Sequence, residues 1–118
     1  MAKLMTYDQI RRLKRQWAEL EDARSRGASY DPKPVLKLFT PDAGATWLLA
    51  GLSQDERTGW GAVDLGLGFV EVGEIDMAEL NTLRGRLGLP VERDRWFTPS
   101  ATLSVYQQEG ARCSQLIA

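Results

Sequence analysis

The sequence predicts an α+β fold: an antiparallel sheet of about four to five strands, with an N-terminal helix and short C-terminal helices. Three observations predict it. A stretch near the N-terminus places apolar residues at helical spacing. The stretch from Val35 to Leu52 has two apolar runs joined by a four-residue turn. Further short apolar runs, separated by glycine-containing turns, continue to about residue 97.

The N-terminal helix is expected from about Tyr7 to about Arg24. Thr6 and Gln9 have the spacing of a capping box, in which each side chain bonds the backbone N–H of the other residue. Gly27 is expected to end the helix. The apolar stripe of this helix consists of Ile10, Leu13, Trp17 and Leu20.

The expected hairpin turns at residues 41–44, Pro-Asp-Ala-Gly, and the sheet begins at about residue 35. Proline presets φ at the first corner, Asp bonds its own backbone, and Gly tolerates positive φ. Residues 60–65 and 69–75 predict a third and a fourth strand. Gly73 is expected to mark a bulge or a close backbone approach.

The later elements are shorter. Asp76 predicts the cap of a helix over residues 77–84. Residues 91–97 have strand character but are highly charged, which suits an edge strand. A last helix is expected at about residues 103–108, before a polar tail from about Gly110. The side chains expected in the core are Leu13, Trp17, Leu36, Leu38, Trp47, Leu49, Val63, Val70, Leu80 and Leu83.

The 118 residues predict a single domain, residues 1–118, because a chain of this length buries a core without staples. No apolar run approaches the ~20 residues needed to cross a bilayer. We expect no secretory signal and no membrane partner. The single cysteine, Cys113, excludes an intramolecular disulfide, so the expected location is cytoplasmic.

The sequence contains no histidine, which removes His-activated nucleophiles, His-ligated zinc and imidazole acid–base chemistry. We therefore expect no enzyme, no cofactor and no metal. Acids do gather in the region of the third and fourth strands, and paired carboxylates can bind a hard cation or hydrolyse glycosides. Their spacing matches no metal-binding loop, and a carboxylate-based hydrolase is the least favoured function. These acids are Asp64, Glu71, Glu74 and Asp76.

The net charge is −1, but the charges are unevenly distributed. Residues 1–30 carry seven Lys or Arg against four acids, and the remainder carries eight against twelve. This balance is not that of a general nucleic-acid coat protein, which needs a dominant positive field. The basic cluster of the first helix either forms a solvated face or faces a partner. It consists of Arg11, Arg12, Lys14 and Arg15.

A second basic cluster flanks the turn at residues 87–90. Four guanidinium groups can form an anion site for phosphate or for a partner's carboxylates. Glu92 and Asp94 lie between them, and the alternative is an exposed edge of mixed charge. Trp60 and Trp96 have glycine or charged neighbours, so both are expected to be half exposed, as binding hot spots often are. The four arginines are Arg84, Arg86, Arg93 and Arg95.

Three segments carry a resemblance to a known family: residues 35–49, 64–73 and 83–94. They resemble the blocks of domain-of-unknown-function family 2958, small bacterial proteins common on plasmids, phages and integrated conjugative elements. The chain departs from the family at Ala62-Val63, where Leu-Cys is frequent. It also has Arg86 where Pro is common and Trp96 where His is common. The last two departures add a charge and an aromatic ring to the second basic cluster.

The resemblance implies a mobile-DNA context but no activity. By analogy we expect a non-enzymatic protein that binds and inhibits a host nucleic-acid defence complex, of the anti-CRISPR or anti-restriction type. The alternative is a nucleic-acid-binding accessory or regulatory factor of plasmid or phage maintenance or transfer. The expected partner is a host defence protein or nucleoprotein complex, and direct nucleic-acid binding is not favoured. The expected binding residues are Arg84, Arg86, Arg93, Arg95 and Trp96, with Arg11, Arg12, Lys14 and Arg15 as a second candidate.

Overall fold

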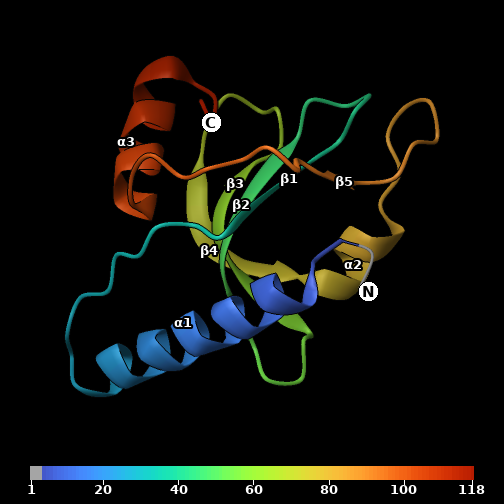
Figure 1. Cartoon of the computed structure of the whole chain (residues 1–118). Helices are drawn as coiled ribbons and strands as arrows, with labels where there is room; N and C mark the ends of the chain where they lie inside the picture. Colours follow the sequence, from blue (N-terminus) through green and yellow to red (C-terminus); the bar gives the residue numbers. More distant parts are fainter. Residues whose placement is uncertain (1–3) are drawn as a thin grey trace.

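A computed structural model describes residues 4–118 and confirms the α+β class, with an N-terminal helix, an antiparallel sheet and a C-terminal helix (Figure 1). The elements of the described chain are α1 (Tyr7–Ser25), β1 (Leu36–Phe39), β2 (Thr46–Leu52), β3 (Thr58–Asp64), β4 (Glu71–Asp76), α2 (Met77–Thr82), β5 (Glu92–Arg93) and α3 (Leu103–Cys113). The predicted capping box at the start of α1 is present, and the side chain of Asp76 caps α2.

The strands form one antiparallel sheet in the order β4-β3-β2-β1-β5. The predicted hairpin joins β1 to β2, where Phe39 pairs with Thr46, and Gly44 in its turn has a φ of +74°. β5 pairs with β1 through only two residues, Glu92 and Arg93. The sheet therefore ends in a six-residue strand, β4, on one side and a two-residue strand, β5, on the other.

The irregularity expected at Gly73 lies elsewhere. β3 and β4 pair in one unbroken register, in which Gly61 lies opposite Gly73, and the register shift falls between Leu49 and Gly51 of β2. A Cβ on Gly73 would meet nothing within 4 Å, whereas a Cβ on Gly61 would lie 1.9 Å from the carbonyl oxygen of Leu48. The close backbone approach therefore belongs to the inner strand β3.

The core lies on both faces of the sheet, because successive side chains of a strand point to opposite faces. Trp47 and Leu49 of β2 belong to a cluster with the start of α1 and with α2. Leu48 and Ala50 belong to a second cluster with α3 and with residues that follow β5. Figure 1 shows α3 lying over β3 and β4 on one side of the sheet. The predicted core residues that are buried are Leu13, Leu36, Leu38, Trp47, Leu49, Val70 and Leu80.

Two predictions about large side chains are wrong. Leu83 is 39% exposed, because α2 ends at Thr82 and does not carry Leu83 on its buried face. Trp60 is buried, because Tyr30 from the linker after α1 stacks on its ring at a centroid distance of 6.2 Å. Trp17 and Val63 pack against the core as expected, but their side chains are only partly buried.

The end of the chain also differs from the prediction. α3 continues to Cys113, whereas a polar tail was expected from Gly110. Gly110 is buried, and a Cβ there would lie 2.4 Å from Cγ2 of Val70, so the helix packs closely on the sheet at this point. Beyond the helix, the backbone N–H of Leu116 donates to the carboxylate of Asp64 at 2.9 Å. The C-terminal segment is thereby held against the end of β3.

Candidate functional site

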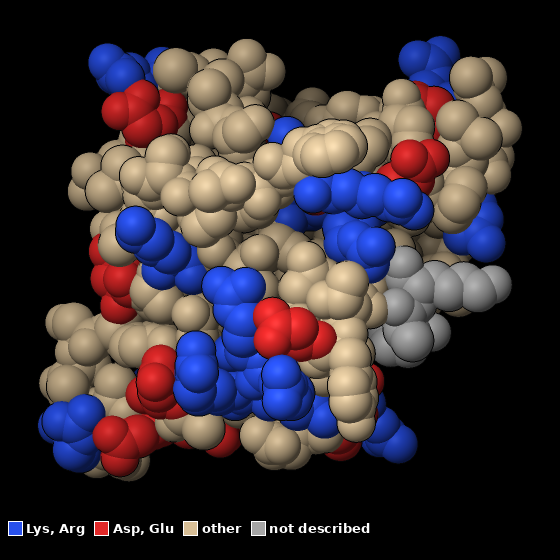
Figure 2. Space-filling view, viewed as in Figure 1, with Lys and Arg blue, Asp and Glu red and all other residues tan. Residues whose placement is uncertain are grey.

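The two predicted basic clusters lie on one face of the molecule. Figure 2 shows Lys and Arg side chains gathered over α1 and, on the same face, over β5 and the chain around it. We call this surface the basic face: the exposed Lys and Arg of α1 together with the arginines of residues 84–95. Sequence reasoning treated the two clusters as rivals, whereas the fold makes them neighbours.

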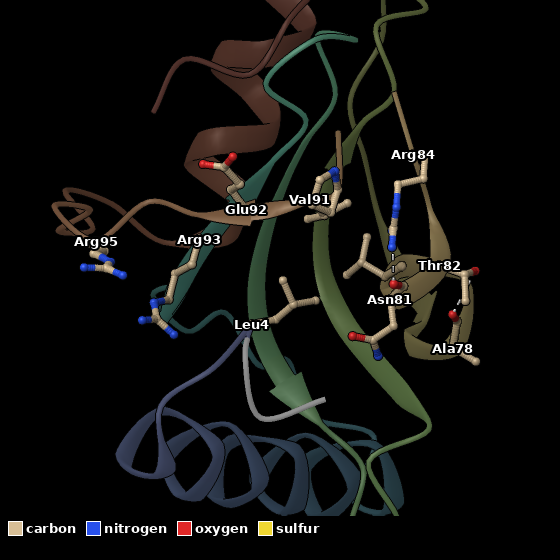
Figure 3. A pocket seen from close by; sticks show the side chains of 11 residues that line it. Leu4, Ala78, Asn81, Thr82, Arg84, Val91, Glu92, Arg93 and Arg95 are labelled. Carbon is tan, nitrogen blue, oxygen red and sulfur yellow. Dashed lines mark hydrogen bonds between the residues drawn. The ribbon is translucent and has the colours of Figure 1, made fainter. Parts of the chain in front are cut away.

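A groove of about 940 Å³ forms part of the basic face. Arg93 and Arg95 line one wall of the groove, and Arg84 lines the opposite wall beside α2 (Figure 3). Leu4 and Val91 contribute apolar surface between the walls. The groove therefore combines three guanidinium groups with an apolar floor, and such a surface suits an anionic partner that also buries some apolar area.

The position of Arg93 follows from strand pairing. Arg93 lies opposite Leu38 of β1, whose side chain is fully buried on the face of the sheet that α2 covers. Val91, two residues earlier, is buried on the same face, since alternate residues of an extended segment share a face. Arg93 therefore extends over the groove. Glu92 also lines the groove, but its carboxylate points the opposite way from Arg93 (Figure 3).

Arg84 is partly engaged within the chain. Its guanidinium donates to the carbonyl oxygen of Leu83 at 2.9 Å and to that of Asn81 at 3.5 Å. Basic side chains commonly bond the last carbonyl groups of a helix in this way, so Arg84 closes the C-terminus of α2. Arg84 therefore shapes the groove, and Arg93 and Arg95 are freer to meet a ligand.

Arg86 and Trp96, the two residues at the second basic cluster that depart from the family pattern the chain resembles, do not line the groove. Arg86 is exposed in the loop that follows Arg84, and Trp96 is 90% exposed beyond β5. The backbone N–H of Trp96 donates to the carboxylate of Asp94 at 2.9 Å, which fixes the turn. That carboxylate also lies 3.8 Å from the ammonium group of Lys37, so it faces Lys37 and does not neutralise the arginines.

The basic residues of α1 divide into paired and unpaired groups. Arg11 bonds Asp8 at 3.2 Å, and Lys14 bonds Glu56 at 2.9 Å. Arg12 and Arg15 form no ion pair with a described residue. The same holds, within residues 4–118, for the four arginines of the second cluster. The arginines without an ion pair on these two segments are Arg12, Arg15, Arg84, Arg86, Arg93 and Arg95.

Asp42 supports this site and was not predicted as part of it. Its carboxylate accepts from the backbone N–H of Leu87 at 2.6 Å and from that of Leu89 at 3.4 Å. The other carboxylate oxygen is buried without a hydrogen-bond partner in the described chain. A Cβ on Gly85 would lie only 1.5 Å from that oxygen. Asp42 in the β1–β2 turn therefore holds the loop that follows Arg84 close to the sheet.

Only contacts within the fold place Asp42 beside the arginines, since it lies 45 positions before Leu87 in the sequence. The available sequence signal was the pair of glycine-containing turns at residues 41–44 and 85–88. Two such turns can stabilise each other only when the fold brings them together, and a single sequence does not show that pairing.

The predicted acidic cluster does not converge on one point. Asp64 is buried and accepts from the backbone N–H groups of Gly66 and Leu116. Asp76 caps α2, and Glu74 lies 3.9 Å from Arg24. Within residues 4–118, no three Cys, Asp or Glu side chains lie close enough to hold a metal ion. In the same range, no helix is long and apolar enough to cross a membrane.

The pKa shifts of the described residues lie away from the groove. Burial raises the pKa of Tyr30, and its hydrogen bond to Glu19 raises it further. Burial acts to raise the pKa of Asp31, but hydrogen bonds from Ser104 and Thr102 outweigh it, so the pKa falls below 3.8. Because Ser104 lies in the first turn of α3, the Asp31 carboxylate caps that helix from a distant part of the chain. Both groups act in structure rather than in chemistry at the basic face.

The fold and the site define a class: a small α+β protein whose five-stranded antiparallel sheet carries a basic groove at the short edge strand. The model of a family described as protein of unknown function (DUF2958) matches residues 4–117. The chain therefore belongs to the DUF2958 family. No curated protein and no solved structure matches the chain.

Proposed function

We propose that this protein acts by binding, not by catalysis, and that its basic face binds a host nucleic-acid defence complex and inhibits it. The observation that carries the proposal is the gathering, on one face, of arginines that form no ion pair within the described chain. A protein of net charge −1 has no electrostatic reason to concentrate unpaired guanidinium groups there. Solvated charges are better spread apart because like charges repel.

The chemistry of the groove indicates the kind of surface that it would bind. Arg93 and Arg95 offer planar, forked donors that match the carboxylates of a protein or the phosphates of its bound nucleic acid. Trp96, next in sequence, offers an exposed ring of the type that anchors interfaces. A defence complex with bound nucleic acid presents both protein carboxylates and nucleic-acid phosphates near its nucleic-acid-binding surface. Occupying that surface would block the complex without any chemical step.

A second function is favoured by one specific observation. Because α1 and the segment around β5 contribute to the same face, the local positive field is stronger than the net charge implies. Such a field attracts nucleic acid directly, as an accessory or regulatory factor of plasmid or phage maintenance or transfer would require. We place either function in the cytoplasm, where the exposed free thiol of Cys113 would stay reduced.

A protection assay tests the leading proposal. Bacteria with an active restriction or CRISPR system are challenged with a targeted phage, with and without the protein. The wild type should restore phage growth in at least one such host, and the double variant Arg93→Ala, Arg95→Ala should not. The control is Arg26→Ala, which removes an arginine that bonds Asp22 at the far end of α1.

A gel shift separates the two functions. Single- and double-stranded DNA are titrated with the pure protein at ~150 mM salt. Weak or absent binding, together with protection in cells, would support inhibition of a protein complex. Tight binding that falls steeply with added salt and is lost in the double variant would favour the nucleic-acid-binding function.

A further inference from the structure

We propose that the free edge of β4 binds an extended segment of a partner protein, carrying Lys or Arg beside apolar residues, as a sixth strand of the sheet. This surface lies at the opposite edge of the sheet from β5, so the proposal goes beyond the function assigned to the basic face. It rests on three observations: unpaired backbone groups, an apolar hollow beside them, and an excess of negative charge around them.

The backbone of β4 presents unpaired groups outward. The N–H of Met77 donates to the carbonyl of Arg57 at 3.0 Å, and this bond shows which residues of β4 direct their backbone N–H and C=O groups toward β3. In an antiparallel pair the hydrogen-bonded positions alternate, so residues 71, 73 and 75 bond to β3. The N–H and C=O groups of Val72 and Glu74 therefore point away from the sheet. No described residue bonds to these outward groups.

Charge is the main protection of this edge against pairing. Natural sheets shorten their edge strands, bulge them, charge them or cover them. β4 is six residues long and keeps a regular register with β3, although its acidic side chains offer protection by charge. Glu71 and Glu74 are exposed, and Gly73 has open space where a side chain would stand. No neighbouring atom therefore fills the space beside Gly73 in the middle of β4.

Two hollows beside the edge, one of them apolar, can take up side chains of the incoming strand. One hollow, of about 340 Å³, is lined by Trp47, Val63, Leu65, Ile75 and Leu83 among others. Leu65 is 53% exposed and Leu83 is 39% exposed, so both offer apolar surface that a partner could cover. A second hollow, of about 580 Å³, is lined mainly by polar residues and shares residues 74–76 with the first. A strand added along β4 would therefore pass both hollows at these residues.

The charges around the edge decide which segment fits. The acids at the edge and the hollows are Glu71, Glu74, Asp76 and Glu79. Two arginines lie nearby: Arg24, whose guanidinium is 3.9 Å from Glu74, and Arg57 at the second hollow. The excess is negative, so Lys or Arg on the incoming segment would be favoured. Pairing of two β4 edges would bring like charges together across the strands, which argues against a second copy as the occupant.

The first test uses two synthetic peptides, Lys-Val-Lys-Val-Lys-Val and Glu-Val-Glu-Val-Glu-Val, titrated into ¹⁵N-labelled protein. The basic peptide should shift the backbone amides of Val72 and Glu74 and of neighbours in the two hollows. The acidic peptide should not. Shifts that map away from β4, equal shifts with both peptides, or no binding of the basic peptide at millimolar concentration would overturn the proposal.

The second test separates backbone pairing from charge. Glu74→Pro removes an N–H that points outward while sparing the bonds to β3, and it should weaken binding of the basic peptide about tenfold. Glu74→Ala keeps that N–H and loses only an exposed charge, so binding should weaken about twofold. Equal binding by the proline variant and the wild type would contradict strand addition. Thermal unfolding confirms that the variants are folded.

Charge reversal keeps the test decisive if the proline variant does not fold. Glu71→Lys together with Glu74→Lys changes only exposed side chains, and it should invert the preference so that the acidic peptide binds better. An unchanged preference would mean that the edge is not the binding surface. Size-exclusion chromatography should show the free wild type as a monomer. A wild-type dimer that is absent in the charge-reversal variant would mean that a second copy of the chain, and not a partner protein, pairs with β4.

Discussion

The two edges of the sheet differ in length, charge and protection. β5 consists of two residues, and the chain around it carries unpaired arginines beside a groove. β4 consists of six residues, carries acids and keeps free backbone groups beside an apolar hollow. One edge therefore offers side-chain charge, and the other offers main-chain pairing. The difference teaches that a protein with a net charge of −1 can carry one surface that favours anionic ligands and another that favours cationic ones.

The largest expected effect is on stability and concerns two glycines that face each other, one in the inner strand β3 and one in the edge strand β4. Gly61 of β3 lies opposite Gly73 of β4, but a Cβ would meet the Leu48 carbonyl at 1.9 Å in the first case and nothing within 4 Å in the second. Gly61→Ala should therefore lower the free energy of unfolding by about 3 kcal/mol or prevent folding. Gly73→Ala should change it by no more than about 0.5 kcal/mol. Urea denaturation of both variants measures the contrast, and equal losses would mean that the space beside Gly73 is not open.

The next effect concerns binding at the basic face. Replacing Arg93 or Trp96 by Ala should weaken binding of the target complex by roughly 2 kcal/mol, because both types anchor interfaces. Stability should change little, since Trp96 is 90% exposed and Arg93 forms no ion pair in the described chain. Calorimetric titration measures both affinities. If both variants bind as the wild type does while Arg12→Ala with Arg15→Ala does not, the binding surface is α1 rather than the β5 edge.

A smaller effect concerns the loop beside the basic edge. Asp42→Ala removes the acceptor of the Leu87 and Leu89 N–H groups and should cost about 1–2 kcal/mol of stability. Hydrogen exchange should speed up at these two amides and stay unchanged in β4. Asp55→Ala is the matched control, since Asp55 also accepts a backbone N–H, that of Arg57, but at the other end of the sheet. Faster exchange throughout the sheet would show that Asp42 stabilises the whole fold and not the basic edge in particular.

The smallest effect depends on pH and concerns the side of the molecule that carries β4. The pKa of Asp31 is lower in the folded protein than its usual 3.8, so its stabilising contribution is complete above that value. The contribution is lost as the pH falls through the lower, folded pKa, when the carboxylate that caps α3 becomes protonated. Removing this cap with Asp31→Ala should cost about 1 kcal/mol at neutral pH. Between pH 7 and about pH 3, the free energy of unfolding should fall less steeply in the variant than in the wild type. Parallel curves would contradict the assignment of Asp31 as the cap of α3.

Local signals in the sequence predicted much of the fold. The capping box at Thr6, the Asp76 cap and the turn at residues 41–44 each act within four residues, so their chemistry can be read directly from the chain. The errors came from contacts between distant segments. Trp60 is buried by Tyr30, and Gly110 continues α3 because it packs on Val70.

The candidate site was predicted in composition but not in arrangement. Both basic clusters follow from counting residues, whereas their union on one face depends on β5 pairing beside β1. Of the predicted cluster, Arg84, Arg93 and Arg95 share the groove, and Arg86 and Trp96 do not. The free edge of β4 could not be predicted, because strand order within a sheet is set by long-range pairing and not by local pattern.

One measurement tests the contrast between the two edges most directly: two probes added in turn to one labelled sample. Short single-stranded DNA at low salt reports where positive potential attracts an anion, and the Lys-Val peptide reports where a strand can add. We predict that the DNA shifts the amides of α1 and of residues 84–96, and that the peptide shifts those of β4. Both probes shifting the same edge, or the DNA shifting β4, would contradict the account.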